Sequence, residues 1–138
     1  MPRKLSNPPE KSVVMLVDDM QAMRMLTRSA LKHMGFKKFV ECANGVEAIK
    51  RLKLMNVDLV VCDWDMPEMN GLELLQEVRA DDRLKSLPFM MLTANSSADL
   101  IHECISAGVD SYMVKPYQPI ALCKRINTLL KEPLAKIA

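Results

Sequence analysis

Residues 57–79 read VDLVVCDWDMPEMNGLELLQEVR, which predicts a strand, a turn and a helix in succession. The run 59–62 is apolar at every position, as is typical of a short strand buried on both faces of a parallel sheet. Asp63 ends this run, and the turn-forming pair Asn70-Gly71 follows it. The helix after the turn is indicated by three apolar residues at helical spacing, Leu72, Leu75 and Val78.

The same succession of strand and helix occurs along most of the chain. The expected strands cover residues 13–17, 39–43, 59–62, 89–92 and 112–114. The expected helices cover residues 20–34, 44–56, 72–80, 98–107 and 119–130. This alternation predicts the α/β class, as a doubly wound five-stranded parallel sheet with helices on both faces.

The domain organisation is expected to be simple, because 138 residues are the length of one ordinary domain. Residues 1–12 contain several prolines and mixed charges without periodicity, which predicts a flexible leader. The domain itself is expected to cover residues 13–131, and residues 132–138 form a short tail. The sequence indicates no internal repeat and no second domain.

The composition excludes several classes of protein. Apolar residues make up 49% of the chain and charged residues 26%, as in a globular domain rather than a disordered one. No apolar run is long enough to cross a membrane, and the N-terminal residues lack the apolar stretch of a signal peptide. We therefore expect a cytoplasmic protein without membrane insertion, and nothing requires more than a monomer.

Charge and cysteine spacing exclude two further classes. The formal net charge is +2, and the chain has only 3 Phe, 2 Tyr and 1 Trp, so no nucleic-acid partner is indicated. The cysteines lie far apart without a C-x-x-C pair, which argues against a zinc or redox site. We expect buried, reduced thiols at Cys42, Cys62, Cys104 and Cys123.

Polar side chains directly follow four of the five expected strands. They are Asp18 and Asp19, Asp63, Thr93 and Lys115. Ligands of an open parallel sheet bind at the carboxyl ends of its strands. We therefore expect these side chains to gather at one edge of the sheet, although each of them alone has an ordinary explanation as a helix cap or a surface residue.

Three carboxylates at one place predict a bound cation. Two of them 4 Å apart repel by about 4 kcal/mol at an effective dielectric constant near 20. Mg²⁺ prefers carboxylates, water and phosphate oxygens, and together with Lys115 it would bring the net charge of the cluster to zero. A phosphoryl group could then approach Asp63, whose carboxylate would attack it to form an acyl phosphate. The Lys115 ammonium and the Thr93 hydroxyl would bind its oxygens.

Four stretches resemble the receiver domain of bacterial two-component systems, and in particular its CheY-type chemotaxis branch. They are VVMLVDDM (13–20) with the following Met23-Arg24, VDLVVCDWDMPEMNGLELLQEVR (57–79), PFMMLTAN (88–95) and AGVDSYMVKPYQP (107–119). The Trp in DWDMP, directly after Asp63, points to the chemotaxis branch. The resemblance implies a flavodoxin-like fold with strand order 2-1-3-4-5.

The resemblance also implies roles for individual residues. Asp63 would be the phosphoacceptor, and Asp19 and Asp63 would bind Mg²⁺ directly. Asp18 would act mainly through metal-bound water, and Asp65 would contribute its backbone carbonyl. Asn70 stands where the family usually has Asp, and because both residues tolerate a left-handed turn before Gly71, little effect is expected.

Thr93 and Tyr112 correspond to the family's switch pair. The Thr would move toward the phosphoryl group and the aromatic ring would turn inward, which changes the surface formed by the last two helices and the last strand. The chain would thus be a single-domain response regulator rather than an enzyme. A sensor histidine kinase would be its donor, and its target would be a downstream protein such as the flagellar motor switch.

Two alternatives remain open at this point. A receiver could instead act as a phosphate sink or in a pathway without motor contact, with the same chemistry. The D-x-D of Asp63-Trp64-Asp65 is also found in aspartate-nucleophile phosphohydrolases, although there it normally follows the first strand.

Overall fold

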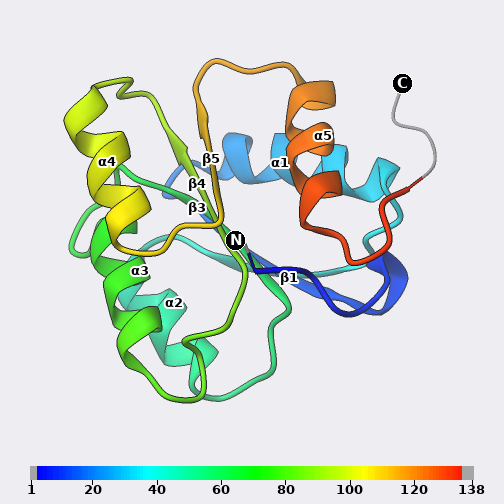
Figure 1. Cartoon of the computed structure of the whole chain (residues 1–138), viewed down its shortest axis with the longest axis horizontal. Helices are drawn as coiled ribbons and strands as arrows, with labels where there is room; N and C mark the ends of the chain where they lie inside the picture. The colour runs from blue at the N-terminus through cyan, green and yellow to red at the C-terminus, as the bar shows by residue number, and fades with distance from the viewer. Residues whose placement is uncertain (1–2, 135–138) are drawn as a thin grey trace.

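The computed structural model describes residues 3–134 and contains one five-stranded parallel sheet (Figure 1). The strands are β1 (Val13–Val17), β2 (Lys38–Cys42), β3 (Leu59–Asp63), β4 (Phe89–Thr93) and β5 (Ser111–Val114). The helices are α1 (Gln21–His33), α2 (Gly45–Leu52), α3 (Gly71–Ala80), α4 (Ala98–Ser106) and α5 (Pro119–Leu129). The sheet order β2-β1-β3-β4-β5 confirms the prediction from the sequence.

The sheet is covered by helices on both faces. In Figure 1, α1 and α5 lie on one side of it, and α2, α3 and α4 lie on the other. Successive side chains of β1 alternate between these sides, with Val14 packing into the core beneath α1 and α5 and Met15 into the core beneath α2 and α3. Because both faces are buried, β1, β3 and β4 are apolar at almost every position.

Side-chain caps fix where three of the helices begin. Asn44, Asn70 and Ser97 each accept a hydrogen bond from the backbone N–H three residues later. The prediction of a left-handed backbone at Asn70 is wrong, because the backbone there is extended (φ −76°, ψ 173°). Asn70 instead forms a capping box with Glu73, and the positive φ in this turn belongs to Glu68 at 67°.

Residues 3–12, which we call the N-terminal strap, pack against the domain, so the prediction of a flexible leader is wrong for them. Leu5 is 1% exposed and forms a parallel bridge with Leu130. Its N–H donates to the Leu129 carbonyl at 2.5 Å, and its carbonyl accepts from the Lys131 N–H at 3.1 Å. Leu5 and Pro9 are the buried apolar residues of the strap, and two such residues are too few to give a periodic signal in the sequence. Residues 1–2 of the expected leader lie outside the described residues.

A buried carboxylate holds the start of the strap. Asp110 accepts from the Arg3 N–H at 2.6 Å, from Arg79 Nη2 at 3.0 Å and from the Phe89 N–H at 2.8 Å. These partners satisfy a charge that would be costly to bury alone. At the other end of the chain, Leu134 packs on the core, whereas residues 135–138 of the expected tail lie outside the described residues.

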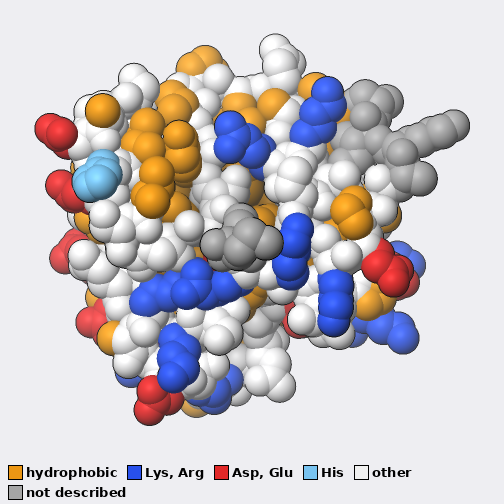
Figure 2. Space-filling view, in the orientation of Figure 1, with side chains coloured by type: hydrophobic (Ala, Val, Ile, Leu, Met, Phe, Trp, Pro, Cys, Tyr) orange, Lys and Arg blue, Asp and Glu red, His pale blue; other side chains and the backbone are white. Residues whose placement is uncertain are grey.

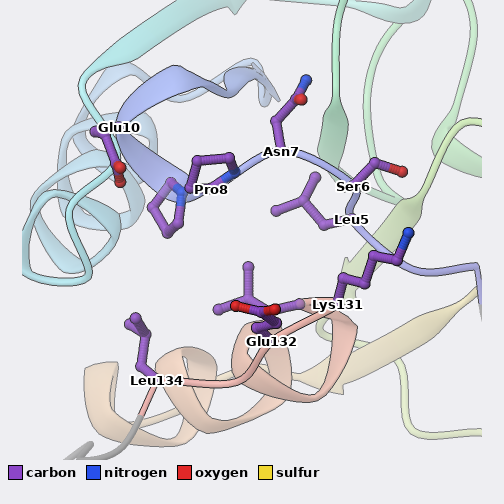
Figure 3. Close-up of a pocket in the computed structure, with 10 residues that line it drawn as sticks. Leu5, Ser6, Asn7, Pro8, Glu10, Lys131, Glu132 and Leu134 are labelled. Atoms are coloured by element: carbon purple, nitrogen blue, oxygen red, sulfur yellow. The ribbon is translucent and has the colours of Figure 1, made fainter.

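A cavity of about 490 Å³ separates the strap from the segment after α5, as Figure 3 shows. Leu5, Pro9, Leu130 and Leu134 are among the residues that line it. It lies at the amino ends of the strands, whereas open parallel sheets bind their ligands at the carboxyl ends. We therefore assign it no ligand.

Leu5→Ala is expected to lower the free energy of unfolding by about 2–4 kcal/mol, because a fully buried side chain is replaced by a cavity. Urea unfolding measures this change, with Ser6→Ala as the control, since Ser6 is exposed in the same strap. If Leu5→Ala unfolds at the same urea concentration as the wild type, the packing of the strap is contradicted.

The four cysteines are buried and free, as predicted. Burial raises the pKa of Cys42 to about 11 and raises the pKa of Cys62 well above its ordinary value, so both are neutral thiols at pH 7. Among the described residues, no helix has the length and hydropathy needed to span a bilayer.

Candidate functional site

Three aspartates from two adjacent strands form an acidic cluster. Val17 pairs with Cys62 in the register of β1 and β3, so the residues that follow them, Asp18 and Asp63, lie side by side. Asp19 completes the group, and one carboxylate oxygen from each residue lies within 4.8 Å of the others. The structure thus brings together the three carboxylates that the sequence predicted.

Lys115 joins the acidic cluster from the far end of the sheet. Its main-chain N–H, directly after β5, donates to the Thr93 carbonyl at 2.7 Å. Its ammonium Nζ lies 3.3 Å from Asp18 Oδ2 and 3.2 Å from Asp63 Oδ1. The peptide bond between Lys115 and Pro116 is cis. One cation thus links the two buried carboxylates.

The cluster keeps an excess of negative charge. Burial raises the pKa of Asp63, the Lys115 ammonium lowers it and the Asp18 carboxylate raises it, and the net shift is upward. Burial lowers the pKa of Lys115, but the attraction of Asp63 and Asp18 outweighs it, so that pKa is raised as well. Lys115 is therefore charged at pH 7, but its attraction does not fully offset the effect of burial on Asp63.

The hydroxyl of Thr93 lies at the same edge of the sheet but bonds to the following loop. It accepts a hydrogen bond from the Asn95 N–H at 2.9 Å and lies 3.3 Å from the Asn95 carbonyl. Thr93 is only 2% exposed. A contact between this hydroxyl and a group bound at Asp63 would have to replace the bonds to Asn95.

Tyr112 lies apart from the acidic cluster, on the surface formed by α4, β5 and α5. The guanidinium of Arg125 on α5 is 5.8 Å from the centroid of its ring. A hollow of about 440 Å³ adjoins the ring, and Ile105 and Val109 also line it. Figure 2 shows hydrophobic side chains gathered over α4 and β5, next to cationic side chains. Tyr112 therefore belongs to a surface rather than to the site itself.

The carboxylate of Asp65 is not part of the acidic cluster, and Asp65 is exposed. The sequence assigned it only a backbone carbonyl, and that role stays a prediction. Trp64, the only Trp of the chain, packs against the core beside Asp63, and its indole N–H is buried without a partner among the described residues.

Arg24 on α1 was matched to the family in the sequence analysis but was assigned no role. Its Nη1 donates to the main-chain carbonyl of Asp18 at 2.5 Å, and its Nε donates to Glu41 Oε1 on β2 at 3.0 Å. Its place in the first turn of α1, shortly after the Asp pair, was the available signal, but an arginine at the start of a helix usually faces solvent.

The donor set of the cluster fits a hard divalent cation. Carboxylate oxygens are the protein ligands that Mg²⁺ prefers, and Mg²⁺ keeps several waters rather than requiring a closed cage. The exposed side chain of Asp19 and the buried side chains of Asp18 and Asp63 form such a half-open site. Burial is the main cause of the raised pKa of Asp63, and a divalent cation beside this carboxylate would stabilise its ionised form.

The chain is similar to known proteins over most of its length. A family model described as the response regulator receiver domain matches residues 14–127. The chemotaxis protein CheY of Pseudomonas aeruginosa is 40% identical over 118 residues, which cover 86% of this chain and 95% of that protein. CheY1 of Helicobacter pylori is 37% identical over 119 residues, which cover 85% of this chain and 95% of that protein. The solved structure of Vibrio cholerae CheY4 matches with a TM-score of 0.79 and 29% identity, covering 86% of this chain and 98% of that one.

Proposed function

This chain belongs to the response regulator receiver family, and from that premise we propose that it is a phosphorylation switch that accepts a phosphoryl group on Asp63. The observation that carries the proposal is the position of Lys115, whose ammonium lies 3.2 Å from Asp63 within the cluster of three carboxylates. A helix cap or a surface ion pair requires no such concentration of charge. As a receiver domain, the protein acts in signalling rather than in metabolic turnover.

The proposed reaction is an in-line transfer to a carboxylate oxygen of Asp63. The bond between phosphorus and the donor nitrogen breaks, a bond from phosphorus to Asp63 forms, and the imidazole of a phosphohistidine donor leaves. The Lys115 ammonium stabilises the negative charge on the transferred oxygens. Asp18, Asp19 and Asp63, with the Asp65 carbonyl, would hold Mg²⁺, which supplies the remaining charge neutralisation.

The proposed switch begins at Thr93. Its hydroxyl exchanges the bonds to Asn95 for one to the phosphoryl group, which gives phosphorylation a mechanical consequence at the end of β4. Tyr112 lies on the neighbouring strand beside a hollow of about 440 Å³, so its ring has space to change position. The surface that changes is the one formed by α4, β5 and α5.

The proposed pathway is chemotaxis, with a histidine kinase as donor and the flagellar motor switch as target, in the cytoplasm. Its support is the similarity to proteins named chemotaxis protein CheY. A pull-down that compares the unmodified protein with its beryllofluoride form, a mimic of the acyl phosphate, tests the partner. Capture of a motor-switch protein by the beryllofluoride form alone supports the pathway, and binding of other proteins only would point to a phosphate sink or another pathway.

Phosphoryl acceptance is tested with a small phosphodonor such as phosphoramidate. Intact-mass measurement is expected to show one phosphoryl group per chain in the presence of Mg²⁺ and none with a chelator. Hydroxylamine is expected to remove the group, because it cleaves acyl phosphates. Labelling that does not depend on Mg²⁺, or that resists hydroxylamine, would contradict the proposal.

Mg²⁺ is expected to raise the melting temperature, because it relieves the repulsion among the three carboxylates. At about ten times its dissociation constant, a ligand that binds only the folded state stabilises by about 1.4 kcal/mol. For a domain of this size, that raises the melting temperature by about 4 °C or more. Scanning calorimetry with and without millimolar Mg²⁺ measures the shift, with K⁺ at equal ionic strength as the control. An identical melting temperature in both would count against the metal site.

A further inference from the structure

Arg24 connects the acidic cluster to the edge strand of the sheet. Its guanidinium bridges two groups, with Nη1 donating to the Asp18 carbonyl at 2.5 Å and Nε donating to Glu41 Oε1 at 3.0 Å. The Arg24 side chain is only 16% exposed. Glu41 is itself fixed, because its second oxygen accepts from Arg28 Nη1 at 2.9 Å. The carbonyl of Asp18 is thus held by a donor whose own position is fixed.

With the bond from Arg24, every polar atom of Asp18 has a partner. Its N–H donates to the Cys42 carbonyl at 3.1 Å. Its Oδ1 accepts from the Met20 N–H at 2.9 Å, and its Oδ2 accepts from Lys115 at 3.3 Å. Of these partners of Asp18, only the donor to its carbonyl is a side chain from outside the acidic cluster.

The carbonyl of Asp18 belongs to the peptide group that leads into Asp19. A peptide group is planar, so a hydrogen bond that fixes the oxygen also fixes the direction in which the next residue leaves the strand. Asp19 is exposed, whereas Asp18 and Asp63 are buried. The bond from Arg24 therefore aligns the least constrained carboxylate of the cluster.

We propose that Arg24 is a positioning residue for the metal site, acting through the peptide group between Asp18 and Asp19, and that Glu41 keeps it in place. The inference rests on the proposed Mg²⁺ site and assigns this clamp a role in Mg²⁺ affinity and selectivity. Mg²⁺ demands near-ideal octahedral geometry, whereas Ca²⁺ accepts irregular coordination. Loss of the clamp therefore affects Mg²⁺ more than Ca²⁺.

Charge and positioning make opposite predictions for Arg24→Ala. If Arg24 acted only as a positive charge near three carboxylates, its removal would strengthen the binding of any cation. If it orients a ligand, its removal weakens Mg²⁺ binding, and partners of metal ligands typically change affinity by 10–100-fold. The sign of the change therefore separates the two roles.

The test titrates the full-length protein with Mg²⁺ and with Ca²⁺ and follows the fluorescence of Trp64, the only Trp of the chain and the neighbour of Asp63. Arg24→Ala is expected to bind Mg²⁺ about tenfold more weakly, with a clearly smaller loss for Ca²⁺. Arg28→Ala is the matched control, because it removes an arginine from the same Glu41 but leaves both bonds of Arg24, to Glu41 Oε1 and to the Asp18 carbonyl, in place. Its Mg²⁺ affinity is expected to stay within about twofold of the wild type.

Two further variants keep the inference testable if Arg24→Ala folds poorly. Arg24→Lys retains one donor for the carbonyl but cannot also hold Glu41, so it is expected to restore part of the Mg²⁺ affinity. Glu41 lies outside the acidic cluster and contacts Asp18 only by way of Arg24, so Glu41→Gln is expected to weaken Mg²⁺ binding by less than Arg24→Ala does. Unchanged or tighter Mg²⁺ binding in Arg24→Ala, or in Glu41→Gln where the first variant does not fold, overturns the inference.

A purely structural role would give a different pattern. It would lower the melting temperature of Arg24→Ala equally with and without Mg²⁺, whereas the inference expects the Mg²⁺-dependent rise itself to shrink. If Mg²⁺ raises the melting temperature of the wild type and of Arg24→Ala equally, this inference alone is overturned. Wild-type protein without any response overturns the proposed metal site, and this inference with it.

Discussion

Asp63→Asn is expected to abolish phosphoryl acceptance and, in Mg²⁺-free buffer at pH 7, to make the folded domain more stable. The first effect follows from the chemistry, because an amide oxygen replaces the attacking carboxylate. The second follows from the raised pKa of Asp63, whose ionisation is disfavoured in the folded state by burial. The variant lacks that unfavourable charge, and Lys115 keeps Asp18 as its partner.

The pH dependence of stability tests the same assignment. A folded-state pKa above the ordinary value of 3.8 means that the folded protein binds more protons than the unfolded chain between the two values. The contribution of Asp63 to stability is therefore present below pH 3.8 and is lost as pH rises through its folded pKa. Urea unfolding of the wild type over that range, minus the same series for Asp63→Asn, is expected to show this slope.

Asp65→Asn is the matched control for both measurements. Asp65 is exposed and its carboxylate lies outside the acidic cluster, so the variant is expected to keep phosphoryl acceptance. Undiminished labelling of Asp63→Asn, with the label on another residue, would refute Asp63 as the acceptor. Turnover of an external phosphate ester that disappears in Asp65→Asn would instead favour the phosphohydrolase alternative.

Lys115→Ala is expected to lower the free energy of unfolding strongly in Mg²⁺-free buffer. Its ammonium is the shared partner of Asp18 and Asp63, whose side chains are only 8% and 9% exposed. Removing one member of a buried ion pair typically costs about 3–5 kcal/mol, because the remaining charge is left unpaired. We expect a loss of about 3 kcal/mol, at the lower end of this range, because the Lys115 side chain is still 16% exposed.

Mg²⁺ is expected to compensate this loss in part. The variant has no cation among its three carboxylates, so Mg²⁺ should bind more tightly than to the wild type and raise the melting temperature by more. Phosphorylation is nevertheless expected to fall by about 100-fold, because the transferred oxygens lose a positive partner. Urea unfolding, Trp64 fluorescence and mass-detected labelling measure the three effects.

Lys124→Ala is the control for Lys115→Ala, because Lys124 is exposed on α5 and is expected to change stability by less than about 0.5 kcal/mol. Equal stability of the two variants would show that the Lys115 ion pairs contribute nothing. Weaker Mg²⁺ binding in Lys115→Ala would contradict the charge balance assigned to the site.

The acidic cluster was predictable from the sequence because of two general properties of parallel sheets. Buried strands are continuous apolar runs, so their ends are visible, and the strand ends of a parallel sheet meet at one edge. Asp18, Asp19, Asp63 and Lys115 all directly follow such runs, and the structure brings them together.

Contacts made by single side chains were not predictable, because they leave no periodic signal. Leu5 is one apolar residue among prolines, yet it is fully buried. Arg24 looks like a surface residue of a helix, and only the folded structure shows that it reaches the Asp18 carbonyl. The hydrogen bonds of Thr93 to Asn95 likewise depend on the path of the loop after β4.

Because of the N-terminal strap, the buried core and the stretch matched by the family model do not have the same boundaries. The stretch shared with the family covers residues 14–127, yet three fully buried leucines, Leu5, Leu129 and Leu130, lie outside it. They meet each other through backbone hydrogen bonds at the amino ends of the strands. The buried core therefore extends beyond the stretch that the family model matches, and cutting the chain at residues 14 and 127 would remove part of that core.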